Sequence, residues 1–82
     1  MTLAEFRATG RDVPDLATIP HCAASEMHGP GRVYLDTEWP LVIEGSVADG
    51  WYLTIGNRSE RMPSLEAAER DLYEFAVTEG YV

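Results

Sequence analysis

The chain has 82 residues, of which 14 are acidic and six are basic, so its formal net charge is -8 at pH 7. A chain of this length forms one domain, and an apolar fraction of 45% is too high for a largely disordered protein. Affinity for phosphate comes from Lys and Arg, so this composition excludes direct binding to nucleic acid or to an anionic membrane surface.

The first predicted element is a short helix over residues 3–9. Thr2 and Glu5 have the spacing of a capping box, in which each side chain accepts a hydrogen bond from the other residue's backbone N–H. Gly10 ends the helix. Leu3 and Phe6 lie on one helical face, which we expect to join the core.

Residues 11–31 are predicted to form a long surface loop, because three prolines interrupt regular structure there. One helical turn around Leu16 is compatible with this loop and turns Leu16 and Ile19 inward. A loop of this length is typically either functional or mobile.

Strands are predicted over residues 32–36, 41–45 and 51–55, where β-branched and aromatic residues alternate with polar ones. Asp49-Gly50 is a strong hairpin signal, and residues 58–62 are compatible with a short edge strand. The strand side chains expected to face the core are Val33, Leu35, Leu41, Ile43, Trp51, Leu53 and Ile55. Those expected on the opposite face are Arg32, Tyr34, Asp36, Val42, Glu44, Tyr52 and Thr54.

The last predicted element is a helix between Ser64, which caps its N-terminus, and Gly80, which ends it. Its apolar residues recur at helical spacing and form one stripe, made of Leu65, Ala68, Leu72, Phe75 and Ala76. The sequence therefore predicts a single α+β domain: a short N-terminal helix, an antiparallel sheet of three to four strands, and a C-terminal helix packed on one sheet face. The expected core is Phe6, Val33, Leu35, Ile43, Trp51, Leu53, Ile55, Leu65, Leu72 and Phe75.

The only cysteine, Cys22, lies beside His21 in the predicted loop, and His28 follows it. A zinc site needs about four ligands, and adjacent side chains in an extended loop point apart, so no metal or other cofactor is expected. A Cys–His nucleophile needs an orienting group and a pocket that lowers the thiol pKa, and no orienting residue stands out. With no hydrolase, phosphate-loop or zinc-protease motif either, we expect no enzymatic activity. A metal- or thiol-dependent site at these three residues stays as an alternative.

The sheet face opposite the C-terminal helix is the predicted partner surface, because tyrosines among polar groups are typical of protein interfaces. Trp39, in a turn before Pro40, is a second anchor. The acidic side chains suit a basic protein partner, although the same charge also favours solubility. The candidate partner-binding residues are Tyr34, Asp36, Glu38, Trp39, Glu44, Tyr52, Asp71 and Glu74. If this face is open, a homodimer can also form through it.

The predicted order of elements is similar to that of two families of nucleic-acid-binding domains. The stretch GWYLTIGNRSERMPSLEAAERDLYEFAV looks superficially like three-stranded DNA-binding domains of the plant Apetala type, and the order of elements resembles double-stranded-RNA-binding domains. The basic residues that those families use are missing, because only Arg58 and Arg61 lie near the relevant hairpin. Separately, EFRATGRDVPDL, VYLD, WYLTIGN and LEAAERDLYEFAVTEGY together resemble short uncharacterised acidic proteins of alphaproteobacteria and their mobile elements. That resemblance implies no activity.

The functional expectation is a small acidic protein that acts by protein–protein binding. Phage anti-defence proteins such as anti-CRISPRs work in this way, by occupying the basic groove of a nucleic-acid-handling protein. A homodimeric accessory protein is a further alternative. No apolar stretch approaches the ~20 residues that span a bilayer, and MTLAEFRATG lacks the basic region of a signal peptide. We therefore expect no membrane association and a cytoplasmic location.

Overall fold

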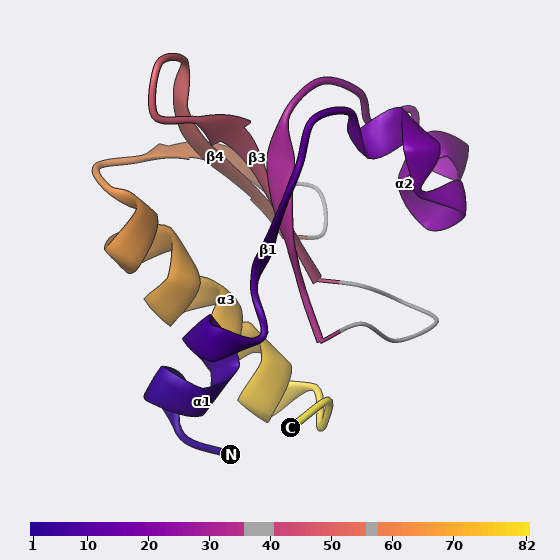
Figure 1. Ribbon diagram of the computed structural model, residues 1–82. Helices are drawn as coiled ribbons and strands as arrows, with labels where there is room; N and C mark the ends of the chain where they lie inside the picture. Colours follow the sequence, from indigo (N-terminus) through magenta and orange to yellow (C-terminus); the bar gives the residue numbers. More distant parts are fainter. Residues whose placement is uncertain (36–40, 56–57) are drawn as a thin grey trace.

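The computed structural model describes residues 1–35, 41–55 and 58–82 (Figure 1). In chain order the elements are α1 (Leu3–Ala8), β1 (Arg11–Val13), the 3-10 turn η1 (Leu16–Thr18), α2 (Pro20–Ala24), β2 (Gly31–Tyr34), β3 (Leu41–Ser46), β4 (Gly50–Ile55), β5 (Arg58–Met62) and α3 (Leu65–Thr78). The strands form one antiparallel sheet of five strands in the order β1-β2-β3-β4-β5. The α+β prediction is confirmed, with one strand more than expected.

The two terminal helices begin where their capping residues predict. Thr2 Oγ1 accepts a hydrogen bond from the Glu5 backbone N–H at 3.1 Å, and Glu5 Oε1 accepts one from the Thr2 N–H at 2.8 Å. These two bonds complete the capping box of α1. Ser64 Oγ accepts from the Ala67 N–H at 3.1 Å and caps α3. Gly80 follows the end of α3 with a positive φ of 78°.

The prediction of a long loop over residues 11–31 is wrong, because this segment contains β1, η1 and α2. Asp15 holds the segment together: its Oδ1 accepts from the backbone N–H of Ala17 at 3.0 Å and of Gly29 at 3.1 Å. Pro20 does not interrupt structure but occupies the first turn of α2, where a missing N–H costs nothing. The predicted turn around Leu16 is confirmed, and Leu16 is fully buried.

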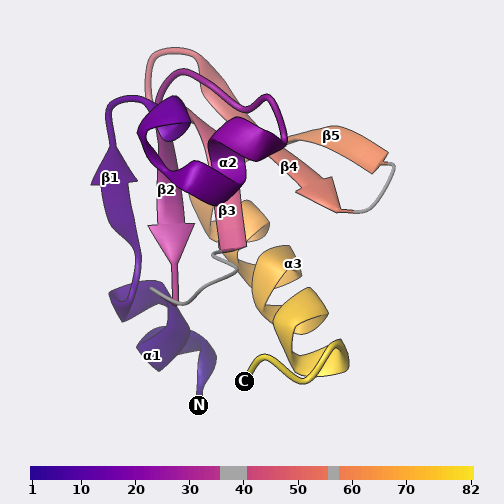
Figure 2. The ribbon, with the colours of Figure 1, turned by 90° about the vertical axis from the view of Figure 1, so that its right-hand side faces the viewer.

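Around β2 and β3 the sheet is covered on both faces, and for this reason one predicted facing is wrong. Figures 1 and 2 show α1 and α3 on one face and α2 on the other, over β2 and β3. Tyr34 was expected to point away from the core, but it is fully buried in the cluster beneath α3. Its neighbour Val33 instead packs with Val13, Leu16 and Cys22 beneath α2. Both residues of the alternating pair are therefore buried, each in a different layer.

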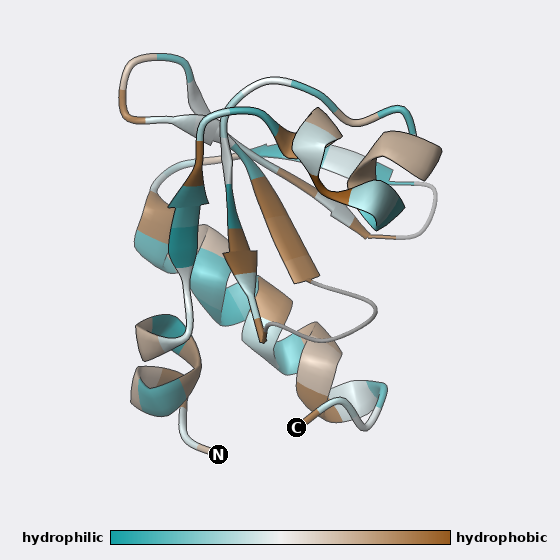
Figure 3. Cartoon of the chain, turned by 45° about the vertical axis from the view of Figure 1, so that its right-hand side comes forward, coloured by the Kyte–Doolittle hydropathy of each residue, from teal (hydrophilic) through white to brown (hydrophobic). Residues whose placement is uncertain are grey.

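The main core lies between the sheet and α3. Its buried members are Phe6, Tyr34, Ile43, Leu53, Met62, Ala68, Leu72 and Ala76. Phe6 stacks on Tyr34 with ring centroids 5.0 Å apart, which joins α1 to the sheet. Of the other expected core residues, Leu35, Trp51, Ile55 and Leu65 pack against this cluster while partly exposed. Hydrophilic and hydrophobic residues alternate along α3, whereas the first half of β3 is hydrophobic (Figure 3).

The hairpin between β3 and β4 forms at the predicted Asp49-Gly50 step, and Gly50 has a φ of 87°. The predicted facing of β4 is confirmed, since Leu53 is buried while Tyr52 and Thr54 are exposed. In the described part of the chain, no helix has the length and apolar character to cross a membrane.

Candidate functional site

The sheet opens between β3 and β4. Three residue pairs join these strands: Glu44 with Tyr52, Gly45 with Trp51 and Ser46 with Gly50. Among the described residues, the pairing of β3 with β4 ends at Glu44 and Tyr52. In contrast, β3 stays paired with β2 as far as Leu41. Figure 2 shows β4 and β5 turning away from the lower half of β3. The sheet therefore separates along this line.

A cavity of about 570 Å³ occupies the separation. Because the sheet is open here, side chains from both of its faces line the same space. The lining residues are His21, Cys22, Ser25, Glu26 and Met27 around α2, Leu41, Val42 and Glu44 on β3, Thr54 and Ile55 on β4, and Leu72 and Phe75 on α3. We call this space the cleft. Its volume lies within the range of about 300–1,000 Å³ that is typical of ligand sites.

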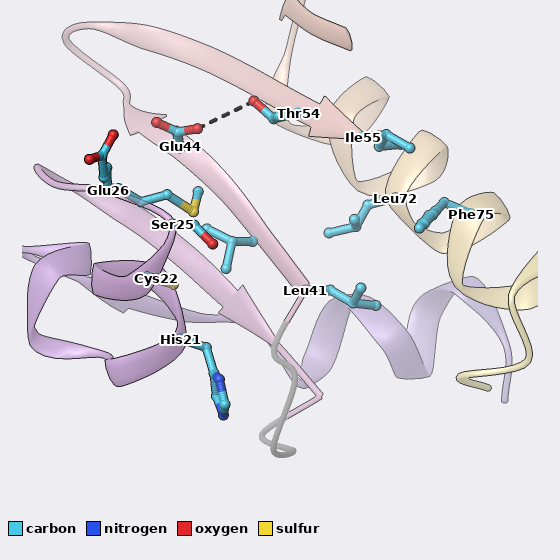
Figure 4. Close-up of a pocket in the computed structure, with 12 residues that line it drawn as sticks. His21, Cys22, Ser25, Glu26, Leu41, Glu44, Thr54, Ile55, Leu72 and Phe75 are labelled. Carbon is cyan, nitrogen blue, oxygen red and sulfur yellow. Dashed lines mark hydrogen bonds between the residues drawn. The ribbon is translucent and has the colours of Figure 1, made fainter. Parts of the chain in front are cut away.

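The two ends of the cleft differ in chemistry. Figure 4 shows Glu26 and Glu44 near one end, where the Thr54 hydroxyl donates to Glu44 Oε1 at 3.4 Å. Leu41, Leu72 and Phe75 lie toward the other end. The described lining includes no Lys or Arg. Such a cleft suits a ligand that combines an apolar group with a cation.

Cys22 lies at the wall of the cleft as a buried thiol. Its residue is only 3% exposed, and burial, followed by the negative charge of Glu44, raises the pKa of the thiol. Both causes oppose formation of the thiolate, which is the reactive form. This environment is the opposite of the one that activates a cysteine nucleophile.

We therefore expect Cys22 to react with iodoacetamide at neutral pH at least about tenfold more slowly in the folded chain than in the unfolded chain. Mass spectrometry of timed samples measures both rates. The matched control is Cys22→Ser combined with Ser25→Cys, which moves the thiol to an exposed position just past α2. Equal alkylation rates for the two folded chains would contradict the burial of Cys22.

The two histidines do not join Cys22 in one cluster. His21 is half-buried on α2, while His28 is exposed beyond it. Across residues 1–35, 41–55 and 58–82, no three His, Cys, Asp or Glu side chains gather closely enough to hold a metal ion.

The predicted partner-binding residues fall on two separate surfaces. The prediction that Tyr34 lies on the partner surface is wrong, because this residue is fully buried. Glu44 and Tyr52 lie opposite each other on the α2 side of the sheet, where β3 and β4 begin to separate. Tyr52 is 37% exposed. Asp71 and Glu74 are exposed on α3. The remaining three candidates, Asp36, Glu38 and Trp39, lie outside the described residues.

A buried carboxylate, Glu69, was not anticipated from the sequence. It is 2% exposed on α3, its Oε1 accepts from Arg7 Nε at 2.9 Å, and its Oε2 accepts from the Tyr34 hydroxyl at 2.6 Å. Burial and then this hydrogen bond raise the pKa of Tyr34. The Tyr34 oxygen also accepts from Arg32 Nε at 3.1 Å, and Arg32 Nη1 donates to Asp12 at 2.7 Å.

This chain of polar contacts ties α1, β1, β2 and α3 together. The signal for it is present in the sequence, because position 69 falls at helical spacing between Leu65 and Leu72 on the apolar stripe. A carboxylate on a buried stripe requires a partner. The partners, however, come from elements far away along the chain.

Comparison of this chain with protein-family models, with curated proteins and with solved structures finds no match.

Proposed function

We propose that this protein acts without catalysis, by binding a basic protein partner. The observation that carries this proposal is the distribution of acidic residues on α3. The C-terminal end of a helix carries a partial negative charge, so Lys or Arg is favoured there and Asp or Glu is disfavoured. The last turn of α3 has no basic residue, and Glu79 is its C-cap. Helix stability alone does not account for acidic residues at this end.

The acidic surface continues from α3 onto the sheet. Asp71 lies across a surface hollow from Glu60 of β5, with Arg58 beside them. Arg58 already contacts Glu60, with a nitrogen–oxygen distance of 3.8 Å. Glu74 follows Asp71 on the same side of α3 and is also exposed. A basic protein surface offers charges complementary to the carboxylates of Glu60, Asp71 and Glu74.

A nucleic-acid-handling protein is the partner class that this proposal favours. Such a protein carries a row of Lys and Arg arranged to neutralise phosphates. An acidic protein that covers this row competes directly with the nucleic acid. The proposed role is thus that of an inhibitor, similar in kind to the anti-CRISPR proteins of phages.

We expect binding to the partner to depend strongly on salt. The tagged chain is used to capture proteins from a bacterial lysate, with washes at about 0.1 M and about 1 M salt, where the screening lengths are about 10 Å and 3 Å. The expected result is a basic nucleic-acid-handling protein that is retained at low salt and released at high salt, and that loses its nucleic acid when the chain binds. Retention that is equal at both salt concentrations would contradict the electrostatic proposal.

The matched variants separate the acidic helix from the net charge. Asp71→Ser with Glu74→Ser removes two charges from the middle of α3, and Asp49→Ser with Glu66→Ser removes two exposed charges from the β3–β4 turn and the start of α3. We expect the first pair to weaken partner binding at least about tenfold, as measured by titration calorimetry, and the second pair to weaken it much less. Equal effects would show that net charge acts without a defined surface.

A further inference from the structure

The separation of β3 from β4 leaves part of the β3 main chain facing the cleft. The Gly45 N–H donates to the Pro30 carbonyl at 2.9 Å, so the backbone groups of Gly45 face β2. These directions alternate along a strand, and those of Glu44 and Val42 therefore face β4. Glu44 has Tyr52 as its register partner, whereas Val42 has none in the described part of β4. One N–H and one C=O of β3 thus point into the cleft.

An extended chain fits this opening better than a helix. Paired strands lie about 4.8 Å apart, and the gap widens from such a pair at Glu44 and Tyr52. A helix is about 10–12 Å across with its side chains and makes no strand-type hydrogen bonds. An extended segment beside Val42 pairs with the backbone groups that face the cleft and have no partner in the described part of β4, and so adds a strand, as in other cases of β-augmentation.

The two faces of such a strand meet different surroundings. Successive side chains of a strand point to opposite faces of the sheet. On the α3 side, the added strand meets Leu41, Ile55 and Phe75, and on the α2 side it meets Glu44 and Glu26. Two adjacent residues of the added strand therefore fit the cleft if one is apolar and faces the α3 side and the other is a cation and faces the α2 side.

We infer that the cleft binds an extended segment of the partner in which Lys or Arg directly neighbours Leu, Met or Phe. This inference rests on the proposed function, because it names the part of a basic partner that this chain recognises. The backbone of Val42 pairs with the segment, the apolar side chain fills the α3 side, and the cation reaches Glu44.

A random heptapeptide library displayed on phage and selected on the immobilised chain provides the probe. The expected result is enrichment of sequences with Lys or Arg directly beside Leu, Met or Phe. On binding the enriched peptide, made synthetically, the Val42 amide should become protected from hydrogen exchange. No enrichment, or enriched sequences without this pairing, would overturn the inference.

Two variants test the cleft itself. Glu44→Gln removes one carboxylate, and Thr54→Trp fills the opening from an exposed strand position that tolerates an aromatic residue. Each should weaken binding of the synthetic peptide at least about tenfold, while Glu66→Gln, the same charge change at the far end of α3, should leave it unchanged. Thermal unfolding confirms that each variant is folded. Unchanged affinity in both cleft variants would overturn the inference.

The outcomes also distinguish this inference from the proposed function. If the basic protein captured at low salt still binds both cleft variants with unchanged affinity, the cleft inference fails and the proposed function stands. If the peptide binds the cleft as expected but no salt-sensitive basic protein is captured, the proposed function fails and the cleft is a peptide site for another partner.

Discussion

Gly45→Ala is expected to destabilise the protein by at least about 3 kcal/mol, because it combines backbone strain with a collision between strands. Gly45 has a φ of 118°, a conformation that side chains with a Cβ rarely adopt. A Cβ built at this position would lie 1.9 Å from the carbonyl oxygen of Gly50, on the facing strand. The variant can fold only if β3 and β4 move apart where they are paired.

Thermal unfolding followed by circular dichroism measures the effect, at about 4–8 °C of lost Tm per kcal/mol in a domain of this size. Gly80→Ala is the matched control: its φ is 78°, and nothing lies within 4 Å of the added Cβ. This control costs only the conformational strain of about 1–2 kcal/mol. If the two variants unfold at the same temperature, the close approach of β3 and β4 at Gly45 is contradicted.

Glu69→Ala is expected to lower the free energy of unfolding by about 3 kcal/mol. It removes the hydrogen-bond acceptor of the charged Arg7 guanidinium and of the buried Tyr34 hydroxyl. The Tyr34 hydroxyl then has no acceptor in the core, and Arg7 loses its carboxylate. Arg7 is half-exposed and regains water, so most of the loss arises at Tyr34. Denaturant unfolding measures the difference in stability.

Glu74→Ala is the control on the same helix, because Glu74 is exposed and lies near the C-terminal end. We expect the free energy of unfolding of the Glu74→Ala variant to stay within about 0.5 kcal/mol of that of the parent chain. A double-mutant cycle with Glu69→Gln and Tyr34→Phe isolates the hydrogen bond itself, with an expected coupling of about 1–3 kcal/mol. A coupling near zero would show that the two groups do not interact in solution.

The sequence predicted the sheet face of the side chains correctly for one strand and wrongly for another. Alternation correctly assigned β4, where one face carries Leu53 and the other carries the more polar Tyr52 and Thr54. It assigned β2 wrongly, because Val33 and Tyr34 are both able to be buried and both faces of β2 are covered. A pattern of period two predicts facing only where one face stays in water.

Local chemistry was enough to determine the capped starts of α1 and α3, the hairpin at Asp49-Gly50 and the mixed α+β class. In each case the interacting groups lie within a few residues, as with Thr2 and Glu5, so neighbouring residue types decide the outcome. The sequence also shows its excess of acidic residues directly.

Only the tertiary structure decided the folding of residues 11–31, the partners of Glu69 and the opening between β3 and β4. Asp15 and Gly29 are 14 residues apart, Arg7 and Glu69 are 62 apart, and the cleft draws its walls from α2, the sheet and α3. Such contacts depend on which distant surfaces pack together, and that packing is set by the burial of apolar area over the whole chain. No local sequence pattern specifies this packing, so the cleft exists only where α2, the sheet and α3 come together.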